Sequence, residues 1–300
     1  MGAIWKWDSL PPPSPPSPTL RQPWRDVKWG KPVKDDLLRF VENYQCGSEV
    51  THIRIMLYGP VATGKSSFVN SATTAVLGRM AIGAGTNRGD ERTQRSYTTQ
   101  YKVHKIRRGR EVPRVYYPVV FNDIMGLEDG EEIGVCPQDI DLVMKGHVKE
   151  GYHFNPRHPL SPTNSEFYNP CPNLSDRVHV LVCVLSANVP GIPTSIIQKM
   201  KEVRERAHQL GIPQVAILTN IDSACPETQK DVQNVYQSKH LLRKMDAFSS
   251  TVGIPINCIF PIKNYSEGNN EKDEDMDTLI LTALKHMLNF ADDFIDSVSD

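Results

Sequence analysis

The sequence predicts an α/β fold with three layers, in which helices cover both faces of a mostly parallel central sheet. Two observations predict it. Short apolar runs rich in β-branched residues alternate with stretches of helical periodicity, as they do in successive βαβ units. The run at 178–185 is rich in β-branched residues and apolar apart from His179, which is typical of a central strand buried on both faces. Ligands of such sheets bind at the carboxyl ends of the strands, so the residues that follow each strand are candidates for a site.

The expected strands come from short apolar runs. The stretch 53–58 leads into a glycine-rich loop, and 101–106 alternates between apolar and polar residues, as an exposed edge strand does. The chain then turns at Gly109 and continues into a second strand. The full set of expected strands is 53–58, 101–106, 115–121, 178–185, 215–218 and 256–259.

The expected helices lie between and around these strands. Apolar residues on one face predict a short amphipathic helix near the start of the chain. Charges on one face mark the helix after 178–185, which Gly211-Ile212-Pro213 ends. An acidic stretch at 271–277 suits the N-terminus of the last helix, because carboxylates stabilise the positive end of a helix. The full set of expected helices is 34–44, 68–77, 138–148, 195–210, 232–249 and 276–296.

Two parts of the chain differ in composition. Residues 1–33 contain a proline-rich run and all four tryptophans, whereas residues 34–300 form the expected globular domain. We expect Trp24 and Trp29 to pack onto that domain as an anchor, because a purely disordered tail would rarely carry so many tryptophans. A proline-rich ligand for a partner module is the alternative interpretation.

Two segments inside the domain have no periodicity. The stretch 80–99 is rich in Gly, Arg and Thr and is expected to be a mobile loop. The stretch 150–177 is rich in Pro, Asn, His and Ser and is expected to be an insertion on the surface, near the nucleotide. It contains His153 and His158, but no matching cysteine or carboxylate spacing supports a metal site there.

The bulk composition is that of an ordinary globular protein. The chain has 300 residues, of which 39% are hydrophobic and 23% charged, and a net charge of −1. With no global positive field, nucleic acid is not an expected partner. The longest apolar stretch, 178–189, is too short for a transmembrane segment. The six cysteines show no metal-ligand pairs, which indicates a reducing, cytoplasmic setting, and Cys183 and Cys258 are expected to be buried thiols.

Basic residues cluster in the predicted hairpin, at positions 102, 105, 107, 108, 110 and 114. A nucleic-acid or lipid surface is one interpretation of this cluster. A solvated hairpin is the favoured one, because no aromatic platform interleaves with the charges.

The strongest motif is the phosphate-binding loop at 59–66, G-x-x-x-x-G-K-S, between an expected strand and an expected helix. Its glycines let the backbone turn tightly, so that successive N–H groups and the helix N-terminus point at an anion. Lys65 brings a positive charge to the outer phosphates, and Ser66 offers a hydroxyl to Mg²⁺. The residues expected to hold the nucleotide here are Gly59, Val61, Ala62, Thr63, Gly64, Lys65, Ser66 and Ser67. A glycine-rich turn with no ligand is the alternative.

A second motif follows the strand at 115–121. Asp123 and Gly126 form D-x-x-G at a strand tip, in which the carboxylate holds Mg²⁺ through a water and the glycine N–H senses a terminal phosphate. Either Thr98 or Thr99, from the expected mobile loop, is predicted to complete the magnesium coordination. The expected metal ligands are therefore Ser66, Thr98 and Asp123, and the best candidates for a catalytic role are Lys65, Thr98 and Thr99.

A third motif, Thr219-Asn220-Ile221-Asp222, follows the strand at 215–218. Guanine-binding P-loop proteins carry [N/T]-K-x-D here, and the aspartate accepts hydrogen bonds from guanine N–H groups that adenine cannot offer. Asp222 is in place, but Asn220 replaces the lysine that packs across the base, so we expect guanine preference with reduced affinity. A T-x-x-D turn without a ligand is the alternative. The three motifs together predict a P-loop NTPase fold of the GTPase-like kind, with Mg²⁺ and GTP or GDP as ligands.

Four segments carry a further resemblance: GPVATGKSSFVNS, FNDIMGLEDG, VAILTNID and CIFPIKNY. Over about residues 22–295 the chain resembles the interferon-induced protein 44-like family, GTPase-like proteins of the vertebrate antiviral response. The resemblance implies that Lys263 or Asn264 lines the base, and that the protein is interferon-induced, cytoplasmic and active in innate immunity. It also implies that longer members have an additional N-terminal domain where this chain has its proline-rich segment.

Catalysis is expected to be slow. Active small GTPases carry a glutamine directly after D-x-x-G that orients the attacking water, and this chain has Leu127. Val61 and Ala62 add bulk to the loop, which would crowd an arginine from a partner. We therefore expect a guanine-nucleotide-binding protein with slow or partner-dependent GTP hydrolysis; a non-catalytic nucleotide-binding or interaction scaffold is the alternative.

An ATP-using kinase is disfavoured by Asp123 and Asp222. An unidentified effector, reading 80–99 and 124–135, and a second copy of the chain are expected partners.

Overall fold

A computed structural model describes residues 19–81, 83–84, 98–130, 133–266 and 271–299, and the backbone of 4–6. The strands are β1 (Ile4–Lys6), β2 (Ile53–Tyr58), β3 (Lys102–Arg108), β4 (Val115–Asp123), β5 (Val180–Ser186), β6 (Gly191–Pro193), β7 (Gln214–Thr219) and β8 (Ile259–Pro261). The α-helices are α1 (Lys31–Asn43), α2 (Lys65–Leu77), α3 (Pro137–Met144), α4 (Thr194–Gln209), α5 (Ile221–Ala224), α6 (Pro226–Lys230), α7 (Lys239–Val252) and α8 (Glu274–Ser299). Short 3-10 turns cover Leu174–Asp176, Val232–Tyr236 and Ile256–Cys258.

The central sheet has six strands in the order β3-β4-β2-β5-β7-β8. Strands β4, β2, β5, β7 and β8 run parallel, and β3 at the edge is antiparallel to β4. The predicted α/β fold with a mostly parallel sheet and an exposed edge strand is thus confirmed. A separate two-stranded sheet pairs β1 with β6.

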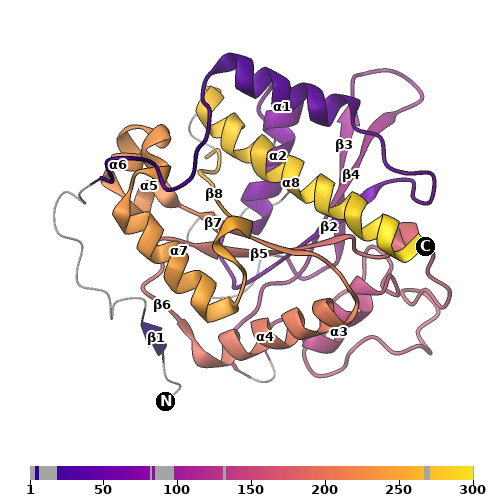
Figure 1. Cartoon of the computed structure of the whole chain (residues 1–300). Helices are drawn as coiled ribbons and strands as arrows, with labels where there is room; N and C mark the ends of the chain where they lie inside the picture. Colours follow the sequence, from indigo (N-terminus) through magenta and orange to yellow (C-terminus); the bar gives the residue numbers. More distant parts are fainter. Residues whose placement is uncertain are drawn as a thin grey trace.

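Helices form a layer on each face of this sheet (Figure 1). Helices α1, α2 and α8 contact one another on one face, and the long α8 crosses β2 and β5. On the other face α4 contacts both α3 and α7. The six-stranded sheet therefore lies between two helical layers, which is the predicted three-layer arrangement.

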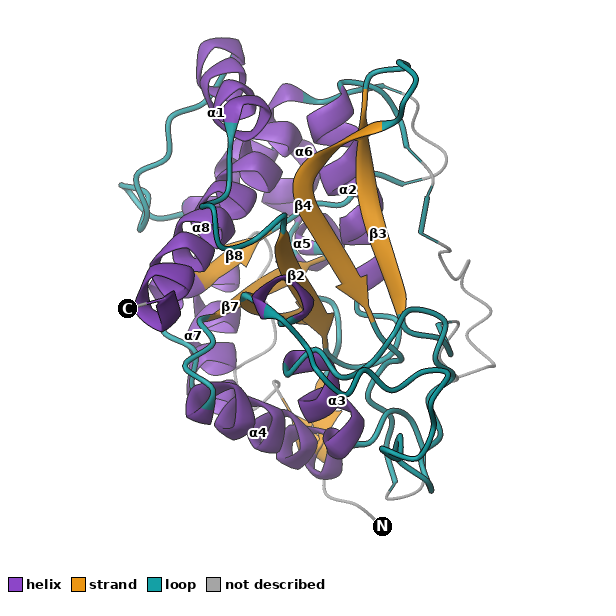
Figure 2. Ribbon diagram, turned by 90° about the vertical axis from the view of Figure 1, so that its right-hand side faces the viewer, coloured by secondary structure: helices purple, strands orange, loops and turns teal. Residues whose placement is uncertain are grey.

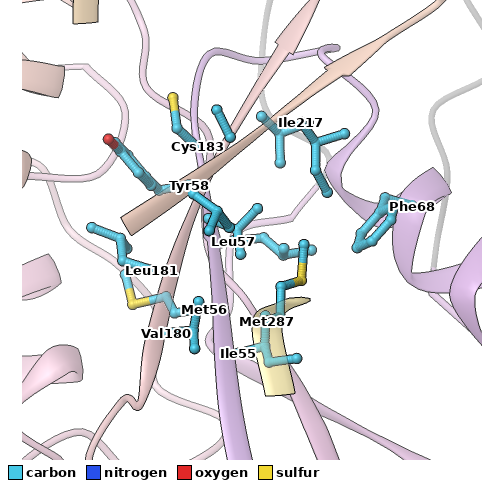
Figure 3. Packing of buried hydrophobic residues seen from close by; sticks show 14 of the residues in the cluster. Ile55, Met56, Leu57, Tyr58, Phe68, Val180, Leu181, Cys183, Ile217 and Met287 are labelled. Carbon is cyan, nitrogen blue, oxygen red and sulfur yellow. The ribbon is translucent and has the colours of Figure 1, made fainter. Parts of the chain in front are cut away.

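The core is centred on the two middle strands. Every residue of β5 is buried, and so are five of the six residues of β2, because both strands have neighbours on each side and helices on each face. Figure 3 shows side chains from β2, β5, β7, α2 and α8 meeting there, among them Ile55, Leu181, Ile217, Phe68 and Met287. Burying each such side chain stabilises the fold by about 1.5–3 kcal/mol, so this packing holds the strand ends in place.

Three predicted elements differ from the structure. The expected helix 232–249 is a 3-10 turn followed by α7, because buried Ser238 accepts a hydrogen bond from the Leu241 N–H at 3.2 Å and starts a new helix. The expected strand 256–259 is mostly a 3-10 turn, and pairing with β7 begins only at Ile259. Helix α3 ends at Met144, short of the predicted 148. Helices α5 and α6 were not predicted at all.

The early termination of α3 has a packing reason. Gly146 has φ +83°, and a Cβ atom there would lie 2.8 Å from the backbone of Asp176. The chain therefore leaves the helix to pass close to the 3-10 turn that precedes β5. The expected burial of Cys183 is confirmed, but Cys258 is only half-buried, because it lies in a turn rather than in the sheet.

The segment before α1 packs against the domain. Trp24 and Trp29 lie against the core, and the Trp24 ring meets Tyr236 edge-on at 5.0 Å. The backbone follows the same surface, since the Leu20 N–H donates to the Gln237 carbonyl at 2.8 Å. The predicted anchoring by Trp24 and Trp29 is thus confirmed. The proline-rich run before residue 19 and most of the predicted mobile loop 80–99 lie outside the described residues.

The segment 150–177 is partly integrated into the core. Tyr152, Phe154 and Leu160 are buried. The carboxylate of Asp139, at the start of α3, accepts hydrogen bonds from the Leu160 N–H at 2.8 Å and the Tyr152 hydroxyl at 3.3 Å. Burial raises the pKa of Asp139, and these hydrogen bonds oppose that rise. The prediction of a surface insertion was therefore incomplete, because part of the segment is buried and hydrogen-bonded to Asp139.

Candidate functional site

The phosphate-binding loop connects β2 to α2 in an unusual backbone conformation. Gly59 has φ +144°, and a Cβ atom there would lie 2.3 Å from the Val184 carbonyl oxygen of β5. Gly64 has φ +89°, so both glycines of the motif occupy conformations that other residues rarely adopt. Ala62 between them has φ +60° although it is not glycine. The backbone of the loop therefore turns tightly, and α2 begins directly after it, at Lys65.

Lys65 lies inside this loop rather than in solvent. Its ammonium donates to the carbonyl oxygens of Gly59 at 3.1 Å and Pro60 at 2.8 Å. Burial lowers the pKa of Lys65 to about 8, against the opposing effect of Asp123 and Glu128 nearby. A buried cation held by two neutral carbonyls is suited to exchange them for an anionic ligand.

Hydroxyl and carboxylate groups meet beside Lys65. The Ser66 hydroxyl donates to Asp123 Oδ2 at 2.8 Å, and the Thr98 hydroxyl donates to the same oxygen at 3.3 Å. Asp123 Oδ1 is buried, and among the described residues it has no hydrogen-bond partner. Thr99, the alternative to Thr98, is exposed, and its carbonyl accepts from the Phe154 N–H at 3.0 Å. This set of hard oxygen donors fits Mg²⁺.

The segment after Asp123 lies against the phosphate-binding loop. The Val61 N–H donates to the Leu127 carbonyl at 3.2 Å, and the Leu127 N–H donates to the Gly59 carbonyl at 3.0 Å. A Cβ atom on Gly126 would lie 2.7 Å from Val61 Cγ2, so only glycine fits this approach. We call this pair of backbone hydrogen bonds the loop bridge. The Leu127 side chain is 1% exposed and belongs to the hydrophobic core.

Lys199 was not predicted from the sequence, and it binds the backbone that follows Leu127. From α4 its ammonium donates to the carbonyls of Glu128 at 3.0 Å, Gly130 at 2.6 Å and Ile133 at 3.1 Å. Burial lowers the pKa of Lys199, and the carboxylates of Asp129 and Glu128 oppose that effect. No sequence signal marks this lysine, because a single cation on an amphipathic helix is usually solvated.

The third motif supports the far side of the loop. The Thr219 hydroxyl donates to the Thr63 carbonyl at 2.7 Å and is 3.1 Å from the Leu185 carbonyl. Asn220 has φ +55°, a conformation that asparagine tolerates better than most residues, and its amide donates to the Ser186 hydroxyl at 2.8 Å. Asn220 therefore adopts a fixed position at the end of β7.

The remaining predicted residues lie around the same end of the sheet. Asp222 is half-buried in the first turn of α5, and Ser67 is half-buried in the first turn of α2. The Asn264 amide nitrogen would be 3.0 Å from a Cβ atom on Gly64, and Asn264 Oδ1 is buried without a hydrogen-bond partner in the described part of the chain. Lys263 beside it is half-buried.

The structure thus brings most of the predicted residues to one edge. The phosphate loop follows β2, Asp123 ends β4, Thr219 ends β7, and Asn264 follows β8. These are the carboxyl ends of parallel strands, as expected. Within the described ranges, no three His, Cys, Asp or Glu residues are grouped in a way that could hold a metal ion.

Comparisons with known proteins find relatives of the chain. No protein-family model matches it. Human interferon-induced protein 44-like is 32% identical over 271 residues, which cover 88% of this chain and 57% of that protein. Human interferon-induced protein 44 is 31% identical over 278 residues, covering 91% and 60%, and the mouse protein is 30% identical over 273 residues, covering 89% and 61%. Over this span the chain is similar to the interferon-induced protein 44 and 44-like proteins. The resemblance seen in the motifs is confirmed.

The chain spans about six tenths of the length of these family members. Among solved structures, Toc33 from Arabidopsis thaliana, a dimerisation-deficient mutant, has a TM-score of 0.48 at 13% identity, with 89% of this chain and 94% of that chain covered. Toc33 in complex with GDP and Mg²⁺ has a TM-score of 0.47 at 14% identity, with coverage of 88% and 94%. The assignment of a GTPase-like fold rests on the strand order and loop geometry of the chain itself. None of the helices in the described part combines the length and apolar character needed to cross a membrane.

Proposed function

We propose that this protein is a member of the interferon-induced protein 44 family, binds a guanine nucleotide with Mg²⁺ and hydrolyses GTP slowly on its own. The observation that carries the proposal is the group beside Lys65. Asp123 accepts from Ser66 and Thr98 through one oxygen, while its other oxygen is buried without a partner among the described residues. An unpaired buried carboxylate oxygen is costly, and a hydrated cation would satisfy it.

Each residue has a separate role in the proposed complex. Lys65 would leave the carbonyls of Gly59 and Pro60 and pair with the outer phosphates. Asp222 and Asn264 would face the base, with Asp222 accepting from its N–H groups. Lys263 remains a second candidate for the base. Mg²⁺, when bound through Ser66, Thr98 and Asp123, would neutralise charge on the phosphates.

Slow hydrolysis follows from Leu127. Its side chain is buried in the core and has no hydrogen-bonding group, so it cannot orient a water molecule. Lys65 and Thr98 are the remaining candidates for a direct part in the reaction, and Thr99 is the weaker one because it is exposed. A single-turnover rate on the order of one per second in the isolated protein would contradict this proposal.

A non-catalytic scaffold is the second candidate, and the loop bridge favours it. The hydrogen bonds between Val61, Leu127 and Gly59 hold the segment after Asp123 against the loop. A switch would have to break or re-form them. Thermal unfolding separates the two candidates, because a switch is stabilised more by a GTP analogue than by GDP, whereas a scaffold is stabilised equally by both.

Calorimetric titration with GTP, GDP and ATP in Mg²⁺ tests nucleotide binding. We expect binding of GTP and GDP but not of ATP, loss of all binding in Lys65→Ala, and loss of the guanine preference in Asp222→Ala. Lys201→Ala, an exposed lysine on α4, is the matched control and should bind as the unaltered protein does. Tighter binding of ATP, or no binding of any nucleotide, would reject the proposed function.

The cellular role follows from the family and is also part of the proposal. We propose a cytoplasmic protein of the interferon-induced antiviral response, with residues 34–300 as the nucleotide-binding domain and 1–33 as a separate segment. An effector would read the segments 80–99 and 124–135. In the second segment the loop bridge holds Leu127, and Lys199 binds the carbonyls of Glu128, Gly130 and Ile133. Nucleotide-dependent association of two copies would provide the groups that the isolated domain lacks for hydrolysis.

A further inference from the structure

The β3–β4 hairpin, residues 102–116, has its turn far from the proposed nucleotide site, whereas Lys102 at its other end pairs with Asp123. Strand β4 begins at Val115 beside the turn and ends at Asp123 beside Lys65. The turn is therefore at the opposite end of the strand from the site, at the edge of the sheet (Figure 2). A partner bound to the turn would leave the nucleotide site open.

The hairpin has a charge that the rest of the chain does not share. Residues 102–116 contain six lysines and arginines and one acidic residue, Glu111, which gives a net charge of +5. The whole chain has a net charge of −1, so the remaining residues sum to −6. Arg110 and Arg114, on either side of the turn, are both exposed. Such a concentrated positive charge attracts an anionic surface even though the protein as a whole does not.

The same turn exposes apolar side chains. Val112 is 90% exposed, Val115 44% and Tyr116 41%. These are three of the five large apolar residues that are exposed in the described part of the chain, and they lie within five consecutive positions. Single exposed apolar residues are common, but a contiguous group surrounded by charges is typical of an interaction surface.

Contacts within the hairpin hold some of the charges beside aromatic rings. The Lys105 ammonium lies 6.0 Å from the centre of the Tyr116 ring, and the Arg108 guanidinium 5.7 Å from that of Tyr117. Arg107 donates to the Glu111 carbonyl at 3.1 Å, which ties the turn to β3. The aromatic residues that the sequence pattern did not place among the charges are therefore present in three dimensions.

We propose that this hairpin docks on a lipid surface that contains anionic headgroups. Val112, Val115 and Tyr116 would enter the interfacial layer, and the surrounding lysines and arginines would pair with lipid phosphates. A nucleic acid fits less well, because single strands are bound by stacking on open aromatic faces, and the most exposed side chain of the turn, Val112, offers no ring. Docking would turn the carboxyl ends of the strands away from the bilayer.

Vesicle sedimentation tests the proposal without nucleotide, so its outcome is independent of the proposed function. The full chain should bind vesicles of phosphatidylcholine with phosphatidylserine, but not pure phosphatidylcholine, and added salt should weaken the binding. Arg110→Gln with Arg114→Gln should weaken binding by on the order of tenfold. Val112→Ser should weaken it several-fold, because the apolar contact is lost. Both variants should unfold at the same temperature as the unaltered protein, because the altered side chains are exposed.

Matched controls remove equal groups elsewhere. Lys201→Gln with Lys230→Gln removes two exposed cations, and Val298→Ser removes a valine on α8 that is 45% exposed. Neither control should change vesicle binding. Equal losses in the controls, binding that does not depend on anionic lipid, or no binding at all would overturn the proposal. Hairpin-dependent binding of RNA by a protein that does not bind vesicles would also overturn it.

Discussion

At the scale of single residues, Lys65 is held where its own charge is costly. Burial lowers its pKa to about 8, from an ordinary value of 10.5. As the pH rises past 8, the folded protein loses this proton before the unfolded chain does, so the unfolded state binds more protons and stability rises between about pH 8 and 10.5. We expect Lys65→Met to remove that rise, which amounts to at most about 3 kcal/mol. Urea unfolding near pH 7 and pH 10 measures it.

The control for this prediction is Lys201→Met, an exposed lysine that should leave the rise unchanged. If unaltered protein and Lys65→Met show the same dependence on pH above about 8, then the ammonium is not buried in the way described.

Leu127 is a core residue, and it occupies the position at which active small GTPases carry a glutamine. We expect Leu127→Gln to lower the free energy of unfolding by about 2 kcal/mol, because an amide replaces an apolar side chain that is 1% exposed. It should not speed GTP hydrolysis, because the loop bridge fixes the backbone with the side chain pointing into the core. Leu127→Met, which keeps the apolar character, should lose less than about 1.5 kcal/mol. A hydrolysis rate in Leu127→Gln well above that of the unaltered protein would show that the side chain can leave the core.

At the scale of elements, α4 determines the shape of the segment after the loop bridge. Lys199 donates to three carbonyls of residues 128–133. We expect Lys199→Met to leave these acceptors unpaired and to lower the free energy of unfolding by about 1–3 kcal/mol. Amide hydrogen exchange should rise in residues 128–130 and not in β5. Lys201→Met, on the exposed side of the same helix, is the control, and equal exchange in both variants would argue against the role of Lys199.

The elements that sequence patterns predicted well are those whose pattern reflects burial on both sides. Strands β2, β5 and β7 are continuous apolar runs because neighbours and helices cover them, and they were predicted to within two residues. The stretch 232–249 reads as one helix, because nothing in its periodicity reveals that buried Ser238 starts a new one. Strand β8 is only three residues long, and its start depends on pairing with β7.

Some residues of the candidate site could be predicted from the sequence, and others could not. The residues of the three motifs could be predicted because local backbone chemistry fixes their spacing, and the strand ends bring them together. The choice between Thr98 and Thr99 could not be made, because it depends on how the chain enters β3. The role of Lys199 and the loop bridge could not be predicted either. Both depend on hydrogen bonds to backbone carbonyls, which every residue has.

At the scale of the whole molecule, His179 makes the fold sensitive to acid. It is buried at the start of β5, accepts from the Arg54 N–H at 2.8 Å and donates to the Leu174 carbonyl at 3.0 Å. Burial lowers its pKa to about 4. As the pH falls from about 6.5 to 4, the unfolded chain takes up a proton that the folded protein does not, so stability falls over that window by at most about 3 kcal/mol.

We expect His179→Gln to be less stable than the unaltered protein at neutral pH but to lose less stability on acidification. Urea unfolding between about pH 7 and pH 4 checks this. His153→Gln is the control, because that histidine is exposed. Parallel pH profiles for the unaltered protein and His179→Gln would mean that other groups determine acid unfolding.

The way in which the phosphate-binding loop is supported has a consequence for the synthesis of the chain. The motif ends at Ser66, but Gly59 packs against Val184, Thr63 is bonded by Thr219 from 156 positions further on, and Asn264 lies against Gly64. At translation rates of about 5–20 residues per second, the ribosome takes on the order of ten seconds to deliver these supports after the motif itself has emerged. A nascent or truncated chain that stops before these supporting residues contains the complete sequence motif but not the folded loop. A nucleotide bound as proposed would therefore stabilise only a nearly complete domain, and it would not guide the early steps of folding.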